Sequence, residues 1–264
     1  LARNVMARDK TLYDGHAVAA VAATNAVIAE EAMNLIEVDY EVLPHVIDVR
    51  EAMKEDAPLL HDDLFTDGVS PKPDKPSNIA KRMEFVLGDI EDGFSKADVV
   101  VEKEFTTKPV HQGYIEPHAC VADTSEDGKI HIHCSSQGQF MVRQFCARVL
   151  DVEISNITVV PAEIGGGFGG KTTVYLEPTA ALLSRKTGKP VKMVMSRTEV
   201  FRASGPTSGG ATKIKIGAKK DGTITAAEAD LAYQAGAFPG SPIGPGCMCA
   251  FAPYNIENVN VIGY

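Results

Sequence analysis

The chain has 264 residues, of which 44% are hydrophobic and 23% are charged, so it can build the core of one large domain or two ordinary ones. A formal net charge of −9 argues against binding to a nucleic-acid backbone, and no apolar run approaches the roughly 20 residues that a membrane helix needs. These features, with no secretory signal pattern, predict a cytoplasmic globular protein that binds neither nucleic acid nor a membrane.

The first 44 residues predict one strand–helix–strand unit with a single covered face. Residues 15–24 (GHAVAAVAAT) are typical of a buried strand, and residues 25–35 (NAVIAEEAMNL) place an apolar stripe behind a cap at Thr24 or Asn25. Residues 36–44 (IEVDYEVLP) alternate as a second strand. Residues 55–80 are rich in Asp, Pro, Ser and Lys without periodicity, and we expect a linker there.

From about residue 81 onward, the pattern predicts strands and helices in irregular alternation. The expected strands are MEFVLGD (83–89), VVVEKEFTT (99–107), KIHIHCSS (129–136), NITVVPAE (156–163) and VKMVMS (191–196). The expected helices are 89–98, 138–150 and 173–188, and residues 211–236 predict a hairpin turned at Asp221-Gly222. Hairpins are too frequent here for a purely doubly wound sheet, so the predicted fold class is α+β, a mixed α/β fold.

The chain begins at Leu1 without a methionine and ends at Tyr264, directly after the strand-like run 259–262, so we expect a fragment. Its odd number of scattered cysteines does not suggest a disulfide framework or a metal site, and predicts buried free thiols: Cys120, Cys134, Cys146, Cys247 and Cys249. His131 and His133 alternate on one face of a strand but lack a fixed third ligand, so we expect an exposed or hydrogen-bonded face.

The stretch EIGGGFGGKTT at residues 163–173 is the most informative of the chain. Gly165 to Thr172 satisfies G-x-x-x-x-G-K-[ST], the pattern of loops that bind nucleotide phosphates, with a strand before it and a helix after it. A P-loop NTPase is therefore one alternative. However, the next strand ends in Ser196 and Arg197 rather than in an aspartate for magnesium, and the sequence after Thr172 predicts mostly hairpins.

Five glycines in the six residues 165–170 suggest a backbone that something bulky must approach closely. A tight turn without function is a weaker explanation, because so many glycines cost conformational entropy. A non-catalytic interaction or scaffold domain also remains open as a third interpretation of the chain.

Several motifs together resemble the molybdenum-binding large chain of the xanthine dehydrogenase and aldehyde oxidase family. GGGFGGK at 165–171, preceded by SSQ at 135–137, is the central match. GHAVAAVAA (15–23) and VDYEVLPHVIDVREAM (38–53) resemble the small α/β domain of the family, and HQGYIEPHACVAD (111–123) and KTGKPVKMVMSRTEVF (186–201) resemble its cofactor-binding domain. The resemblance implies the C-terminal part of a hammerhead-like α/β domain at 1–54, a linker at 55–80 and the first part of a molybdopterin-binding domain at 81–264.

The resemblance also implies roles for individual residues. Gln137 matches the glutamine whose amide faces the apical oxo ligand of molybdenum, where a helix begins and an anion is favoured. Phe168 matches the phenylalanine whose backbone approaches the metal ligands and whose ring flanks the substrate. A solvated first-turn residue and a core phenylalanine are the respective alternatives. The residues implied in binding the cofactor are Gln137, Gly166, Gly167, Phe168, Gly169 and Gly170.

The chain departs from the xanthine-specific members of the family in two places. Thr172 stands where those members carry a glutamate, and the resemblance implies that it contacts the substrate together with Phe168. The second departure is PIGPGCMCAF (242–251), which contains no arginine where those members carry one. These departures argue against purine hydroxylation and leave an aldehyde, an N-heterocycle or an aromatic derivative. The family's general-base glutamate and an Ala-Phe-Arg-Gly motif do not occur in these 264 residues, so we expect no turnover from the chain alone.

The family chemistry implied is hydroxylation with oxygen from water, hydride transfer to a molybdenum sulfido group, and electron transfer to iron–sulfur and flavin groups. The implied cofactors are molybdopterin, with a cytosine dinucleotide form left open, and 2Fe–2S and FAD in partner domains or subunits. His111, Glu116 and His118 lie in a family-like motif, and we expect them to have a structural role near the domain core. The implied assembly is a homo-oligomer of the full complex that acts on a small molecule.

Overall fold

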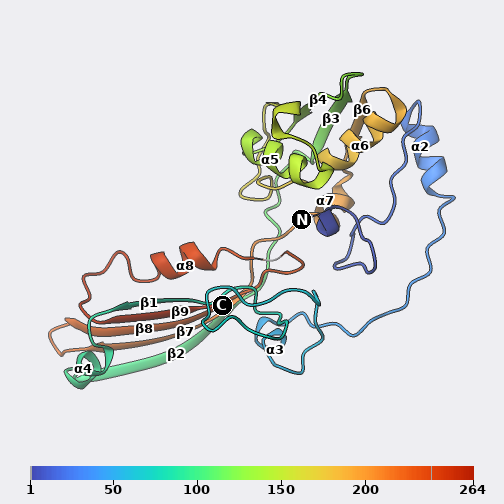
Figure 1. Cartoon of the computed structure of the whole chain (residues 1–264). Coiled ribbons are helices and arrows are strands. Elements are labelled where there is room, and N and C mark those ends of the chain that lie inside the picture. The colour runs from blue at the N-terminus through green and yellow to red at the C-terminus, as the bar shows by residue number, and fades with distance from the viewer. Residues whose placement is uncertain (1, 239) are drawn as a thin grey trace. The chain divides into compact units, whose positions relative to one another are not determined.

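The computed structural model describes residues 2–238 and 240–264, and its chain divides into two compact units (Figure 1). One unit comprises Leu1–Val42 and His111–Thr207, and the other comprises Leu43–Val110 and Ser208–Tyr264. Both contain a mixed sheet with helices, so the predicted α+β class is confirmed. No helix within the described residues is long and apolar enough to cross a membrane.

The first unit is built on a four-stranded sheet in the order β5-β4-β3-β6. Its strands are β3 (Ala119–Thr124), β4 (Ile130–Cys134), β5 (Ile157–Pro161) and β6 (Val191–Val194). Strands β4 and β5 are parallel, because α5 (Gln139–Leu150) and the short 3₁₀ helix η1 (Ile154–Asn156) connect them, whereas the other pairs are antiparallel. Helix α6 (Glu177–Thr187) follows the glycine-rich segment and ends at Gly188 in the left-handed region.

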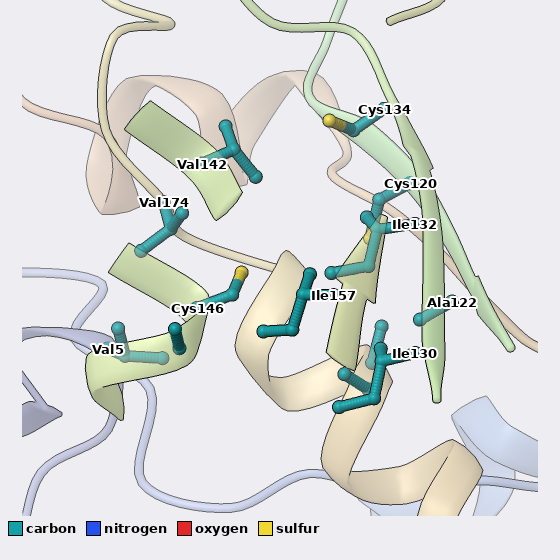
Figure 2. Packing of buried hydrophobic residues seen from close by; sticks show 13 residues of the cluster. Val5, Cys120, Ala122, Ile130, Ile132, Cys134, Val142, Cys146, Ile157 and Val174 are labelled. Carbon is teal, nitrogen blue, oxygen red and sulfur yellow. The ribbon is translucent and has the colours of Figure 1, made fainter. Parts of the chain in front are cut away.

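The core of this unit follows from the alternation of β4. Ile130, Ile132 and Cys134 are buried, whereas His131 and His133 are exposed, as the sequence predicts. The inward side chains pack against residues of α5, with Val142 and Cys146 lying near Ile157 of β5 (Figure 2). Helices α5 and α6 therefore pack against the sheet.

The second unit contains a five-stranded sheet in the order β1-β9-β8-β7-β2. Its strands are β1 (Met83–Leu87), β2 (Val99–Thr107), β7 (Gly210–Ala218), β8 (Ile224–Tyr233) and β9 (Val259–Gly263), with β8 and β9 parallel. Strands β7 and β8 form the predicted hairpin, and Gly222 lies in the left-handed region at its turn. Its remaining helices are α3 (Val49–Ala52), α4 (Ile90–Ser95) and α8 (Ile243–Cys249).

The second unit has an apolar core at one part of its sheet and charged pairs at another. Ile243 and Cys247 of α8 pack against Val259 and Val261 of β9, which gives the unit its apolar core. Charged pairs link strands elsewhere on the sheet, and Arg50 of α3 bonds Asp230 of β8 at 2.9 Å. The unit thus has a core of its own, as an independent domain requires.

The predicted strand–helix–strand unit at the start of the chain is wrong in its strands. The helix exists as α2 (Ala26–Met33), capped by Asn25, whose side chain accepts a hydrogen bond from Ile28 N at 3.0 Å. Residues 15–24 and 36–44 form no strand, because neither segment finds a partner strand among the described residues. Without a sheet to cover, α2 buries none of its residues.

Four short helices and one strand are missing from the expectations based on the sequence. Helices α1 (Ala2–Val5) and α3 span one turn each, and α8 contains two glycines and a proline, so none shows a clear helical period. Helix α7 (Arg197–Ala203) begins with a capping box formed by Ser196 and Glu199, a signal that the sequence does contain. Strand β3 lies within the motif 111–123, whose polar residues mask its alternation.

The thiol prediction holds for four cysteines and is wrong for one. All five are free; Cys249 is exposed at the end of α8, and the other four are buried. Burial raises the pKa of the Cys134 thiol to about 12, so this group stays protonated and acts as a small apolar side chain. Among the described residues, no group of three or more His, Cys, Asp or Glu side chains could hold a metal ion.

Candidate functional site

The glycine-rich segment forms a strained loop between β5 and α6. Gly166, Phe168 and Gly169 all lie in the left-handed region, with φ of +94°, +46° and +91°. Glycine adopts this region freely, but a residue such as phenylalanine does so at a cost on the order of 1–3 kcal/mol. A strained residue persists only where its surroundings fix it, and such residues cluster at functional sites.

Gln137 fixes the loop from the outside. Its side-chain Oε1 accepts hydrogen bonds from Gly169 N at 2.9 Å and from Lys171 N at 3.1 Å. Because both partners are backbone donors, the amide oxygen must face the loop, and this assigns the orientation of the amide. The two N–H donors of Nε2 therefore point away from Gly169 N and Lys171 N. Gln137 lies just before α5 and is exposed, so the alternative of a solvated residue at the start of the helix stays open beside these two bonds.

The glycines of the loop serve two different purposes. A Cβ atom at Gly167 would lie 2.6 Å from Gln137 Oε1, so only glycine lets the loop pack against this side chain. At Gly169, by contrast, no heavy atom of the described residues lies within 4 Å of the Cβ position. The backbone of Gly169 is thus open to an approaching group. This open position gives a bulky group room to approach the backbone, although Gly169 N itself already donates to Gln137.

Phe168 and Thr172 lie on the exposed part of the loop. Phe168 is 72% exposed, so it takes no part in a hydrophobic core among the described residues. The Thr172 hydroxyl is exposed and donates to Gly169 O at 3.0 Å, so its side chain is turned back toward the loop. The ring of Phe168 is available as a flat apolar wall, while Gly166 and Gly170 shape the backbone beside it.

Lys171 closes the loop and points into the protein. Its side chain is 0% exposed, and Nζ lies 2.6 Å from Glu116 Oε2 and 5.0 Å from the centre of the Tyr114 ring. In a P-loop this lysine reaches outward to nucleotide phosphates. Here its charge is buried and neutralised, so the P-loop alternative does not fit the geometry, although the sequence pattern matches.

A buried hydrogen-bond network lies beneath Lys171, with Tyr114, His118 and Ser204 at its centre. The Ser204 hydroxyl donates to Val200 O at 2.5 Å, so the Tyr114 hydroxyl, 3.1 Å away, must donate to Ser204 Oγ. The Tyr114 oxygen then accepts from His118 Nε2 at 2.7 Å. His111 Nε2 lies 3.0 Å from Ser204 Oγ and donates a second hydrogen bond to this oxygen. The directions of the bonds require that His118 carries a proton on Nε2.

The environment of His118 keeps it neutral. The side chain is 3% exposed, and burial, followed by the positive charge of Lys171, lowers the pKa of His118 to about 4. The carboxylate of Glu116 opposes this effect but does not overcome it. His118 is thus a structural hydrogen-bond donor at neutral pH, rather than a general base.

We expect His118 to make the first unit less stable in acid. Because its pKa is lowered in the folded state, the unfolded chain binds a proton below about pH 6.5, whereas the folded chain does so only near pH 4. The free energy of unfolding should therefore fall by up to about 3 kcal/mol between these values and stay level above pH 6.5. Urea unfolding of the full-length protein at several pH values measures this loss, and His118→Gln should remove it. An equal pH dependence in both proteins would contradict it.

Sequence reasoning expected only a structural role for His111, Glu116 and His118. The structure places Glu116 and His118 beside Lys171, which belongs to both the nucleotide pattern and the GGGFGGK motif. His111 joins the same network through Ser204. Glu116 and Lys171 are 55 positions apart, so no spacing signal reveals their pairing. The sequence signal that relates Glu116 to Lys171 is that both lie in motifs that resemble the xanthine dehydrogenase and aldehyde oxidase family.

Two family models and several known proteins match this chain. The chain matches a molybdopterin cofactor-binding domain over residues 71–264, and an aldehyde oxidase and xanthine dehydrogenase a/b hammerhead domain over residues 1–44. It is 32% identical to a probable xanthine dehydrogenase subunit of Bacillus subtilis, over 98% of the chain and 33% of that protein. It is 31% identical to a nicotinate dehydrogenase large molybdopterin subunit of Eubacterium barkeri, over 96% of the chain and 57% of that protein.

A solved structure shows the same fold. The aldehyde oxidoreductase of Desulfovibrio gigas superimposes with a TM-score of 0.75 at 27% identity, over 91% of the chain and 26% of that protein. The chain thus spans a third of the length of its Bacillus relative and about a quarter of this oxidoreductase.

Proposed function

The chain belongs to the xanthine dehydrogenase and aldehyde oxidase family, and we propose that it forms one wall of the active site of a molybdenum hydroxylase. In this proposal, residues 1–54 are the end of the hammerhead-like domain, residues 55–80 are a linker, and residues 81–264 begin the molybdopterin-binding domain. The match to the molybdopterin cofactor-binding domain spans residues 71–264 of the chain.

The observation that carries the proposal is the way Gln137 and the glycine loop are joined. Gln137 turns its Oε1 toward the loop, and this presents the Nε2 donors to an anionic ligand. In this proposal, Gln137 would donate a hydrogen bond to an oxygen ligand of the cofactor, and the open backbone of Gly169 with its glycine neighbours would hold the remainder of the group. Phe168 provides the wall against which a planar substrate would lie.

When bound, the molybdenum cofactor supplies the oxidising chemistry, in which an oxygen from water reaches an electron-poor carbon and electrons leave toward iron–sulfur and flavin groups. The residues of this chain would hold and orient the cofactor and the substrate. Gln137 would donate hydrogen bonds to the cofactor, and the glycine loop would leave its backbone free of side chains. The ring of Phe168 would limit the space for the substrate. We propose 2Fe–2S and FAD in partner domains or subunits, a pterin with or without a cytosine nucleotide, and a homo-oligomeric assembly.

We propose an aldehyde or an N-heterocycle other than a purine as the substrate. Relatives are named for xanthine, hypoxanthine and nicotinate, and all three are electron-poor N-heterocycles. Thr172 and the segment 242–251 lack the charged groups of the xanthine-specific members, so purine recognition is disfavoured. The apolar ring of Phe168 suits a flat substrate without a charge next to the reacting carbon.

An isotope experiment tests this function. The full-length protein, isolated with its partners, should convert a member of an aldehyde and N-heterocycle panel in ¹⁸O-labelled water, and the product should carry the label. The chain of 264 residues by itself should show no turnover. Label from dissolved oxygen instead of water, or ATP hydrolysis without oxidation of any compound, would contradict the proposal.

A further inference from the structure

Both ends of the glycine loop are fastened to one carboxylate. Glu116 Oε2 accepts hydrogen bonds from Gly165 N at 2.8 Å and from Lys171 Nζ at 2.6 Å. The backbone joins the same contact, because Glu116 N donates to Gly165 O at 3.4 Å. A Cβ atom at Gly165 would lie 2.7 Å from Glu116 Cβ, so the loop entrance is pressed against this residue. One side chain thereby determines the distance between the first and last residues of the loop.

Lys171 connects this carboxylate to Gln137. Its N–H donates to Gln137 Oε1 at 3.1 Å, and its carbonyl oxygen accepts from Gln137 N at 2.9 Å. The hydroxyl of Ser136 donates to the same carbonyl at 3.4 Å. Lys171 therefore contacts Glu116 through its side chain and Gln137 through both polar groups of its backbone. A displacement of Lys171 must displace the Gln137 amide.

The opposite charges of Lys171 and Glu116 stabilise this contact. A fully buried ammonium group is stable only with a partner, and Glu116 is the only carboxylate paired with Lys171 among the described residues. Burial by itself raises the pKa of Glu116, but the hydrogen bonds from Lys171 and Gly165 outweigh this effect and lower it. The carboxylate is thus ionised at neutral pH. The ring of Tyr114 closes the remaining side, since a Cβ at Gly170 would lie 2.7 Å from Tyr114 Cε1.

We propose that Glu116 is a positioning residue of the molybdenum site: it fixes Lys171 and Gly165, and through Lys171 it sets the orientation of the Gln137 amide toward the cofactor. This inference rests on the proposed function for the identity of the ligand. The fastening of the loop itself rests only on the contacts of the chain.

Hydrogen exchange of the full-length protein tests the proposal. Glu116→Asp keeps the charge but shortens the side chain by one methylene, so it cannot reach both Lys171 and Gly165. Lys171→Met, which removes the ammonium group, is the second variant, and Glu126→Asp at an exposed turn is the matched control. In both loop variants, amide exchange in peptides covering 164–173 should accelerate at least tenfold more than exchange in β3 and β4 does. The control should match the wild type throughout.

A spectroscopic measurement separates positioning from mere stabilisation. In the molybdenum-loaded protein, Glu116→Asp should change the Mo(V) electron paramagnetic resonance signal and lower kcat with little change in KM. Unchanged loop exchange, equal acceleration across β3 and β4, or a wild-type Mo(V) signal beside a loosened loop would overturn the proposal. Molybdenum content is measured on the same samples. A wild-type protein without molybdenum would refute the proposed function, whereas the exchange data would still decide whether Glu116 fastens the loop.

Discussion

Gln137→Leu should lower the turnover number of the complete enzyme by about 100- to 1000-fold, the usual effect of removing a donor that stabilises developing negative charge. Leucine has a similar size but offers neither the Nε2 donors nor the Oε1 acceptor that receives Gly169 N and Lys171 N. The loss should therefore combine a missing contact with the cofactor and a less fixed loop. Steady-state kinetics with molybdenum content measured on each preparation give the effect per loaded site.

Gln144→Leu is the matched control, because Gln144 is exposed on α5 and its replacement makes the same chemical change seven positions away. We expect it to retain the wild-type turnover number. If Gln137→Leu also kept the wild-type turnover number at equal molybdenum loading, Gln137 would not contact the cofactor, and the assignment of the site to this loop would fail.

The second large effect concerns the stability of the Glu116–Lys171 ion pair, and we expect the loss of either partner to have a different cost. Glu116→Gln leaves the Lys171 ammonium group fully buried without a counter-charge, and we expect the free energy of unfolding to fall by about 3–5 kcal/mol. Lys171→Met instead leaves Glu116, whose side chain is 32% exposed, so water can solvate the carboxylate. Methionine also fills the slot of the lysine stem, and the expected loss is about 1–2 kcal/mol.

Exchange of the most protected amides of β3 and β4 reports this free energy in the full-length protein, because these amides exchange only when the unit opens. The exposed Lys192→Met and Glu126→Gln variants serve as controls and should lie within about 0.5 kcal/mol of the wild type. A larger loss from Lys171→Met than from Glu116→Gln would show that the buried charge is not the dominant factor.

The elements that sequence reasoning predicted correctly are those with local signals. Asp221-Gly222 specifies its hairpin turn, the alternation of residues 130–134 separates buried from exposed positions, and the apolar period of 138–150 marks α5. The glycine loop was found for the same reason, since only a backbone with special conformational needs carries five glycines in six residues.

The elements that sequence reasoning missed depend on distant partners. Residues 15–24 and 36–44 have the composition of strands, but a strand exists only where another strand accepts its hydrogen bonds. Likewise, the P-loop alternative would require an outward Lys171, and only the position of Glu116 in space shows that the side chain turns inward. Resemblance to a family suggested Gln137, but the direction of its amide required the positions of two backbone donors.

The central claim is that this loop holds a molybdenum cofactor. Its most direct test is elemental mass spectrometry for molybdenum and iron on the full-length protein, isolated with its native partners from cells supplied with molybdate. We predict that both metals accompany the protein. The absence of both metals would contradict the account: with ATP binding, it would support the nucleotide interpretation of the glycine loop, and without ATP binding, a scaffold.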